Sequence, residues 1–282
     1  VGASMASEFV WDGEGILMHW SVPTATATIY FGCCAAYATA ILPKHAATQA
    51  PRRDWLGAAH NLALVLFSAW ICCNSTALLA AQVSRDGLQH FLCAPVTTPN
   101  VSRPPPLAGP LHYWCYLYYA SKYYELVDTL LLVLRRKRVI LLHALHHGFM
   151  PLVMCLLFDG GVSVSLVALS VVNSFVHIVM YAYFLASSLG HKLPNAMRKQ
   201  ITLLQIFQFS VGVIGGTYYW WHYFQNLRIT RSWPPFAYDV GCAGGDATTV
   251  LIGYISNIAL LFMFVQFYRS AYAGLQKHPK KE

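Results

Sequence analysis

Residues 112–158 read HYWCYLYYASKYYELVDTLLLVLRRKRVILLHALHHGFMPLVMCLLF, two long apolar runs separated by the basic tetrapeptide at 135–138. The runs cover residues 112–134 and 139–158. A helix that crosses the hydrocarbon core of a bilayer needs about 20 predominantly apolar residues. This stretch is therefore predicted to be two membrane-spanning helices joined by a short basic turn. The turn serves first as a solvated anchor and can also help to hold an anionic substrate.

The same pattern continues along the 282-residue chain. Hydrophobic residues make up 56% and charged residues 11%, against ~25% charged in ordinary globular chains. The mean hydropathy is +0.45, which argues against a soluble or a disordered chain. The sequence predicts a single all-α integral membrane domain, residues 1–282, without a separate soluble module. Seven spans are expected, at roughly 20–42, 56–83, 112–134, 139–158, 162–187, 201–224 and 247–272.

The basic residues indicate how these spans are oriented. If the N-terminus lies on the lumenal side, 14 of the 19 Lys and Arg fall in cytosolic segments and four in lumenal ones, with Lys122 inside a span. Such a bias follows the positive-inside rule. We therefore expect a lumenal N-terminus and a cytosolic C-terminus. The net charge of +8 then reflects topology, and nucleic acid is not an expected partner.

The third span carries ionisable residues, which are costly in a membrane and usually functional. At 100° per residue, Lys122, Glu125 and Thr129 share one stripe of the helix, with Asp128 at its edge. A structural ion pair between Lys122 and Glu125 is the simpler alternative. Three charges and a threonine on one side exceed what such a pair needs.

The fourth span carries His143, His146 and His147. Their spacing of i, i+3 and i+4 places three imidazoles on one helix face. A single membrane histidine is commonly a satisfied polar group, but three on one face are hard to explain by packing. We therefore expect this face to carry chemistry.

Two further spans present polar faces. Asn173, His177 and Tyr181 share a face of the fifth span. Gln205 and Gln208 lie three residues apart in the sixth, where they can also bond between helices. Counted at 1.5 Å per residue, the polar residues of these four spans lie ~6 to ~18 Å from the inner helix ends. The seven helices are thus predicted to enclose a polar chamber in the cytosolic half, continuous with an apolar cavity.

Three chemistries are compatible with this chamber. The first is a metal site: helical bundles bind two irons through Glu and Glu-x-x-His ligands, and a zinc site needs three well-placed ligands. The chain has a single H-x-x-H-H segment, which is few ligands for two metals. Neutral imidazole can act as a base or attack an activated carbonyl. A proton-coupled transporter also uses buried histidines and acids, but it needs access to both membrane faces.

Four blocks, in this order, resemble the ELO family of very-long-chain fatty acid elongases, the membrane 3-ketoacyl-CoA synthases. The resemblance is clear from about residue 110 to 270, and the sequence departs from it at Leu145 and Phe184, where tyrosine is common. The blocks are K-x-x-E-x-x-D-T at 122–129, H-x-x-H-H at 143–147, N-x-x-x-H-x-x-M-Y-x-Y at 173–183 and T-x-x-Q-x-x-Q-F at 202–209.

The resemblance implies an activity. A long-chain acyl-CoA condenses with malonyl-CoA, CO2 is lost, and a 3-ketoacyl-CoA two carbons longer is formed. The enzyme would be an acyltransferase of the endoplasmic reticulum membrane that uses no metal or other cofactor. A ketoacyl reductase, a dehydratase and an enoyl reductase would complete the cycle as partners.

The resemblance also implies roles for individual residues. His146 is expected to be the nucleophile that forms an acyl-imidazole. In the rival route both substrates bind together, and histidine acts only as a base. His143 and His147 would orient it or relay protons with Asp128, and His177 would act on the malonyl group. The expected substrate-binding residues are Lys122, Glu125, Thr129, Asn173, Tyr181, Gln205, Gln208, Arg136 and Lys199.

Three further expectations concern the loops and the oligomeric state. Cys93 and Cys242 are the cysteines of the outer loops, so a disulfide is expected in the oxidising lumen. Asn100, in Asn-Val-Ser, is an expected glycosylation site. Gly212 and Gly216 form a G-x-x-x-G pattern that fits either packing inside the bundle or a homodimer face.

Overall fold

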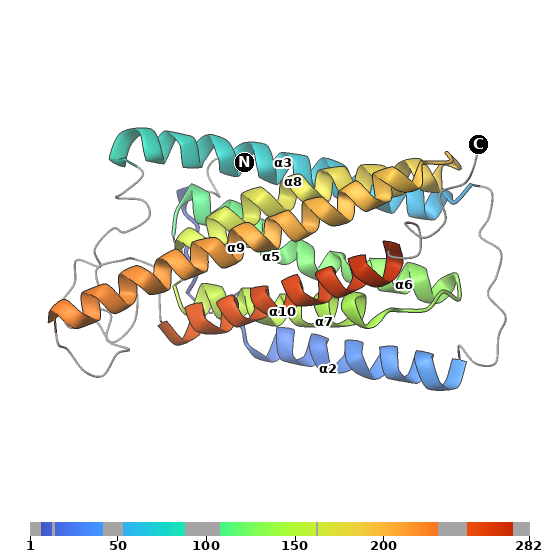
Figure 1. Cartoon of the computed structure of the whole chain (residues 1–282), viewed down its shortest axis with the longest axis horizontal. Coiled ribbons are helices and arrows are strands. Elements are labelled where there is room, and N and C mark those ends of the chain that lie inside the picture. The colour runs from blue at the N-terminus through green and yellow to red at the C-terminus, as the bar shows by residue number, and fades with distance from the viewer. Residues whose placement is uncertain are drawn as a thin grey trace.

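The computed structural model is a bundle of long helices lying side by side (Figure 1). It describes residues 7–12, 15–41, 53–87, 108–161, 163–230 and 247–272. The elements in chain order are η1 (Ile16–Met18), α2 (Ser21–Ala36), the π-helical turn η2 (Tyr37–Ile41), α3 (Trp55–Asp86), α5 (Pro110–Tyr124), α6 (Leu126–Leu134), α7 (Leu141–Asp159), α8 (Ser163–Ser188), α9 (Asn195–Thr230) and α10 (Ala247–Tyr272).

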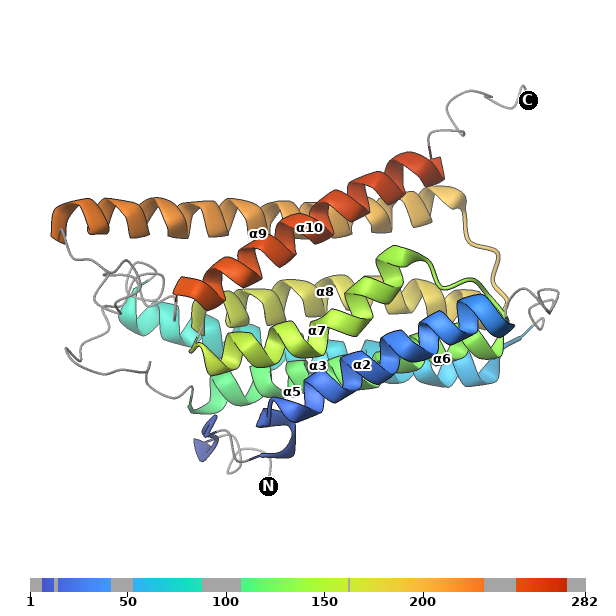
Figure 2. The same cartoon turned by 90° about the horizontal axis from the view of Figure 1, so that it is seen from below.

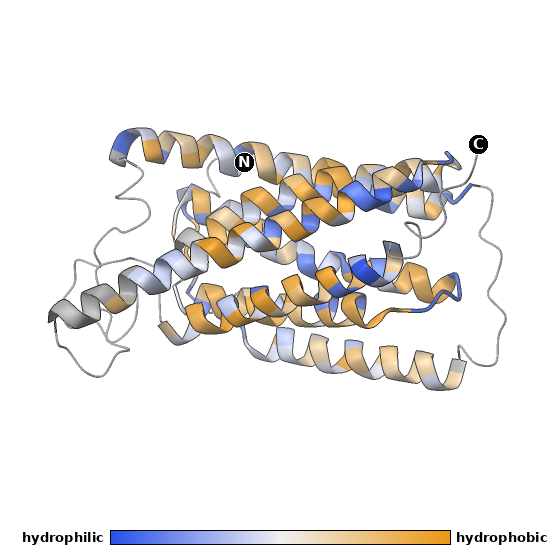
Figure 3. Cartoon of the chain, viewed as in Figure 1, coloured by the Kyte–Doolittle hydropathy of each residue, from blue (hydrophilic) through white to orange (hydrophobic). Residues whose placement is uncertain are grey.

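The described residues confirm the prediction of an all-α membrane protein with seven spans. Helices α3, α7, α8, α9 and α10 are each long and apolar enough to cross a membrane. The first span is α2 continued by η2, and the third is α5 followed by α6. Apolar residues, orange in Figure 3, dominate the middle of the long helices, so the protein is a multi-pass membrane protein.

Six of the spans form a closed circuit. Going round it, α3 packs on α5, α5 on α7, α7 on α10, α10 on α9, α9 on α8, and α8 again on α3. Helix α2 packs against α7 from outside this circuit. Figure 2 shows α2 on the side of the bundle opposite α9. The circuit leaves an interior to which six spans can contribute side chains.

Segments that the sequence assigns to the cytosolic side meet at one end of the bundle. The backbone N–H of Asp54, before α3, donates to the carbonyl of Ser188 at the end of α8 at 2.8 Å. The Asp54 carboxylate also forms an ion pair with Arg135, directly after α6. In Figure 1 the same end, on the right, holds the beginnings of α7 and α9. The helix directions therefore alternate as expected for seven consecutive spans.

The third span is broken, whereas the sequence predicted one continuous helix over 112–134. Helix α5 ends at Tyr124 and α6 begins at Leu126. The Ser121 hydroxyl donates to the Tyr118 carbonyl at 2.7 Å and reaches the Glu125 carboxylate at 3.0 Å. Glu125 itself keeps helical backbone angles, with φ −61° and ψ −17°, and its N–H still donates to the Ser121 carbonyl at 2.8 Å. The interruption is therefore confined to one residue, and α5 and α6 continue as one span.

The G-x-x-x-G pattern of α9 faces α10. A Cβ atom added at Gly216 would fall on the ring of Tyr254, and one at Gly212 would lie 2.8 Å from the Asn257 amide. The Asn257 amide donates to the Phe209 carbonyl of α9 at 2.9 Å. This motif is used for packing inside the bundle, so it does not provide the face of a homodimer. The predicted disulfide residues Cys93 and Cys242 and the glycosylation site Asn100 lie outside the described residues.

The close approach of α9 and α10 predicts a difference between neighbouring glycines. We expect Gly216→Ala to reduce the free energy of unfolding by about 1–3 kcal/mol, because the added methyl group overpacks the contact with Tyr254. The matched control is Gly215→Ala, where a Cβ atom meets nothing within 4 Å. Thermal unfolding in detergent measures both. Equal unfolding midpoints for the two variants would contradict this packing.

Candidate functional site

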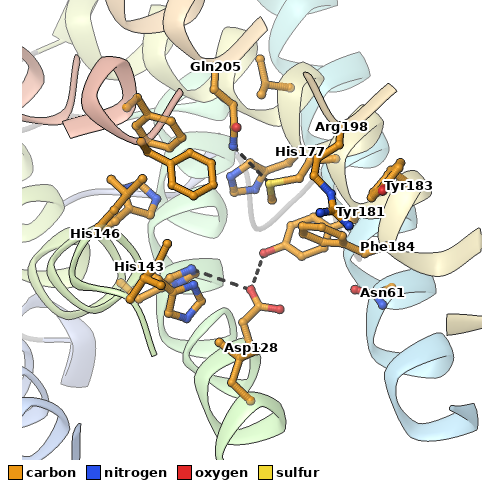
Figure 4. Close-up of a pocket in the computed structure, with 18 of the residues that line it drawn as sticks. Asn61, Asp128, His143, His146, His177, Tyr181, Tyr183, Phe184, Arg198 and Gln205 are labelled. Atoms are coloured by element: carbon orange, nitrogen blue, oxygen red, sulfur yellow. Dashed lines mark hydrogen bonds and ion pairs between the residues drawn. The ribbon is translucent and has the colours of Figure 1, made fainter. Parts of the chain in front are cut away.

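A cavity of about 530 Å³ lies at the centre of the helix circuit (Figure 4). Its size falls within the usual range of ligand-binding sites. Side chains from α3 and from α6 to α10 line it, mixing polar groups with apolar ones. Its polar lining residues include Asn61, Asp128, His143, His146, His147, Asn173, His177, Tyr181, Gln205 and Gln208.

The three histidines of α7 lie in its first turns and line the cavity together. The ring centroids of His143 and His147 are 4.3 Å apart, and those of His146 and His147 are 5.2 Å apart. In Figure 4, His143 and His146 extend from α7, while His177 extends from α8. Two walls of one cavity thus supply imidazoles.

Asp128 of α6 is the centre of a hydrogen-bond network. Tyr181 donates its hydroxyl to Asp128 Oδ2 at 2.6 Å. Nε2 of His60, from α3, lies 2.9 Å from Oδ1. Nε2 of His147 lies 3.9 Å from Oδ2, and a dashed line in Figure 4 marks the bond between Tyr181 and Asp128. One carboxylate therefore connects four helices.

A second network surrounds Glu125 at the break between α5 and α6. Lys122 Nζ donates to Glu125 Oε1 at 2.7 Å, and the Ser121 hydroxyl oxygen lies 3.0 Å from the same oxygen. Nδ1 of His177 lies 3.6 Å from it. Lys122 and Glu125 are 3% and 2% exposed, so this is a buried ion pair. It supports His177 from behind the cavity wall.

Asn173 connects this network to the cavity. Its Oδ1 accepts from the Tyr118 hydroxyl at 2.8 Å and from Lys122 Nζ at 3.3 Å. Lys122 also lies over the ring of Tyr118, 4.1 Å from the centroid. Lys122 is therefore held by several groups of the protein, as expected for a positioning residue.

A third chain of hydrogen bonds reaches the site from α2. Thr129 Oγ1 lies 2.8 Å from His143 Nε2 and 2.9 Å from the hydroxyl of Tyr30. Helix α2 is outside the six-helix circuit but contributes to the surroundings of a cavity histidine. The sequence placed Thr129 at the site but gave no indication of its two partners.

His146 differs from its neighbours because its ring has neither a hydrogen bond nor an ion pair with the described residues. Its Nδ1 is buried without a partner there. By contrast, His143 Nε2 is hydrogen-bonded with Thr129, and His147 Nε2 lies 3.9 Å from Asp128 Oδ2, the distance of an ion pair and not of a hydrogen bond. His146 is thus the member of the three whose ring no other polar group of the described residues holds. A free lone pair is what nucleophilic attack requires.

The basic residues around the cavity differ from those expected. Arg135, Lys137 and Arg198 line it. Arg136 is exposed in the α6–α7 turn with φ of 53°. Lys199 lies 5.8 Å from the ring centroid of Tyr268. Arg136 points away from the cavity because it lies in a tight turn between Arg135 and Lys137. Lys199 follows Arg198 in α9, and one residue along a helix turns the side chain by 100°. The predicted basic rim exists, but adjacent residues form it.

Two polar residues of α3 were not predicted. His60 contacts Asp128, and Asn61 Nδ2 donates to Ser188 Oγ at 3.1 Å. Their position in the first turns of an apolar span is the signal that could have identified them.

The metal alternative requires convergent ligands. Within the described ranges, no group of three or more His, Cys, Asp or Glu side chains is arranged to hold an ion.

The buried ion pair predicts a large effect of losing one partner. Lys122→Met leaves Glu125 as an uncompensated buried charge, and we expect the free energy of unfolding to fall by about 3–5 kcal/mol. Replacing both partners, by Lys122→Met with Glu125→Gln, is expected to restore part of this loss. The control is Lys192→Met at an exposed position. Unfolding of Lys122→Met at the wild-type midpoint would show that the pair does not stabilise the fold.

Comparison with known proteins places this site in a family. The ELO family, described as GNS1/SUR4, matches residues 16–282. Two relatives from Dictyostelium discoideum are "Fatty acid elongase sre1", 33% identical over 79% of this chain and 74% of its own length, and "Fatty acid elongase A", 31% identical over 79% and 73%. "Very long chain fatty acid elongase 7" from Drosophila melanogaster is 30% identical over 76% and 58%. The chain belongs to the ELO family.

Proposed function

We propose that this protein catalyses the condensation step of fatty acid elongation, as a 3-oxoacyl-CoA synthase. The observation that carries the proposal is the unbonded imidazole of His146 in a cavity where Asp128 contacts His147. Family membership supports the same role, since the curated relatives are named fatty acid elongases.

The lining of the cavity suits an acyl-CoA. Apolar side chains, among them Leu131, Val176, Phe209 and Phe264, offer surface for an acyl chain. Arg135, Lys137 and Arg198 supply positive charge for the phosphates of CoA, with which Arg and Lys form charge-assisted hydrogen bonds. The thioester would then lie between the two ends, where the histidines converge.

In the first half-reaction, the imidazole of His146 attacks the thioester carbonyl carbon. A carbon–nitrogen bond forms, the carbon–sulfur bond breaks, and CoA leaves as a thiolate that takes up the proton lost by the imidazole. His147 lies beside His146, with ring centroids 5.2 Å apart, and we assign the relay of this proton to His147 and Asp128. Their Nε2 and Oδ2 atoms are 3.9 Å apart, so the relay requires them to close to hydrogen-bond distance or to be bridged by a water molecule. The acyl-imidazole remains reactive toward a second nucleophile.

In the second half-reaction, malonyl-CoA loses CO2 and the resulting enolate attacks the acyl carbon. A carbon–carbon bond forms, the carbon–nitrogen bond to His146 breaks, and the departing imidazole takes up one proton from solvent, which regenerates neutral His146. His177 and Asn173 face the cavity from α8 and are placed to stabilise the enolate oxygen. The product is a 3-ketoacyl-CoA two carbons longer. The rival route, with both substrates bound together, forms no covalent intermediate.

The remaining parts of the proposal concern cofactors and surroundings. The chemistry needs no metal, because imidazole supplies both the nucleophile and the proton relay. The protein would reside in the endoplasmic reticulum membrane with its N-terminus in the lumen. A ketoacyl reductase, a dehydratase and an enoyl reductase would act on the product there.

The two routes differ when malonyl-CoA is withheld. We expect the purified protein, mixed with acyl-CoA alone, to release about one CoA per active site and to gain the acyl mass on the peptide that contains His146. Adding malonyl-CoA should then give the 3-ketoacyl product, which mass spectrometry detects. His146→Ala should release no CoA, whereas His191→Ala, at an exposed position between α8 and α9, should behave as the wild type.

Two outcomes count against different parts of the proposal. Release of CoA only after malonyl-CoA is added, or a normal burst from His146→Ala, would exclude the acyl-imidazole at His146. If a panel of acyl-CoA substrates with malonyl-CoA yields no product two carbons longer, the proposed function itself is wrong.

The absence of a metal from the chemistry is also testable. We expect the rate of elongation to be unchanged after incubation with a strong chelator and gel filtration, because no step uses a Lewis acid. Elemental analysis of the active protein should find less than stoichiometric iron and zinc. Parallel loss of a bound metal and of activity, both restored by that metal, would favour the metal alternative.

A further inference from the structure

We propose that His60 is a positioning residue that holds the Asp128 carboxylate in the orientation needed for proton relay to His147. This inference rests on the proposed function, because it assigns a task within the same reaction. His60 lies in the second span, outside the four sequence blocks that resemble the ELO family.

The two oxygens of Asp128 are divided between different partners. Oδ1 is 2.9 Å from His60 Nε2. Oδ2 accepts from Tyr181 at 2.6 Å and lies 3.9 Å from His147 Nε2. With Oδ1 fixed by His60, the plane of the carboxylate is set, and Oδ2 remains directed at the cavity. Without His60, the carboxylate could rotate and Oδ1 would lose this partner at a half-buried position, where the side chain is 17% exposed and a lost hydrogen bond is costly.

The ring of His60 is itself held in place. It is 5% exposed. Its centroid lies 5.2 Å from that of Tyr124, and it meets the ring of Tyr181 edge-on at 6.4 Å. Tyr124 ends α5 and Asp128 lies in α6, so His60 contacts both sides of the break in the third span. A residue held on both sides of this break can fix the direction of Asp128.

The hydrogen bond also defines which nitrogen carries a proton. An ionised carboxylate only accepts hydrogen bonds, so His60 must donate through Nε2–H. Its Nδ1 is buried without a partner among the described residues. Rotating the ring by 180° would therefore exchange a strong bond for none. This arrangement resembles the use of a fixed carboxylate to orient a histidine in hydrolases, with His60 one step further from the substrate.

A purely structural role for His60 explains less of the geometry. Helix α3 is already joined to the third span by the ion pair between Asp54, before α3, and Arg135, directly after α6. The bond of His60 instead goes to a carboxylate that lines the cavity and approaches a cavity histidine. Its effect is therefore expected on the rate of the reaction and not mainly on stability.

The test compares three variants with the wild type by steady-state kinetics. We expect His60→Phe to lower kcat about 10- to 100-fold, with the KM for acyl-CoA within about twofold of wild type, because substrate contacts are unchanged. His60→Gln should recover part of the rate, since its amide can donate from near the position of Nε2. His112→Phe, the same exchange at the outer end of α5, is the matched control and should keep the wild-type kcat.

A double-mutant cycle distinguishes positioning from general damage. If His60 acts through Asp128, the double variant His60→Phe with Asp128→Asn should be no slower than Asp128→Asn alone. A wild-type kcat in His60→Phe overturns the inference. So do multiplicative losses in the double variant, or a loss in His60→Gln as large as in His60→Phe when both keep the wild-type unfolding midpoint. An inactive wild type, by contrast, refutes the proposed function and this inference with it.

Discussion

The constraint on which this structure depends is the cost of placing charge and hydrogen-bonding groups where there is no water. Asp128 and Glu125 both lie in the third span, and each is approached by polar groups of other helices. Tyr181 and His60 bond to Asp128, and Nδ1 of His177 lies 3.6 Å from Glu125, which also pairs with Lys122 of its own span. The contacts made by Tyr181, His60 and His177 cross from one helix to the next, so satisfying the carboxylates also fixes how the helices are arranged around the cavity.

The same requirement explains why one histidine can be reactive. In a bundle where most buried polar groups are engaged, a group without a partner stands out. His143 and His147 are directed by Thr129 and Asp128, whereas His146 makes no hydrogen bond to the described residues. The neighbours thus supply orientation and charge, and His146 supplies the lone pair. In the proposed reaction, the nucleophile is therefore one residue, His146, and the proton relay is formed by others, His147 and Asp128.

The length of the apolar runs was enough to predict the seven spans, and helical periodicity was enough to predict the shared face of His143, His146 and His147. Neither could predict that Glu125 meets His177 of α8, because that contact depends on how the helices pack. His60 was missed for the same reason: nothing in its neighbourhood of the sequence indicates that it meets Asp128, 68 positions further along. Long-range pairings of this kind arise only when the helices pack.

Helix α2 shows how a span outside the circuit can still influence the site. Gly148 of α7 lies against the rings of Tyr30 and Phe31, and a Cβ atom there would overlap both. The close approach that this glycine allows brings the Tyr30 hydroxyl to Thr129, and Thr129 in turn contacts His143. Gly148 follows His147 directly, so one short segment of α7 carries both the cavity histidines and the surface on which α2 rests. Movement of α2 would therefore be transmitted to His143 first, through a chain of two hydrogen bonds, while His146 is bound by none of them.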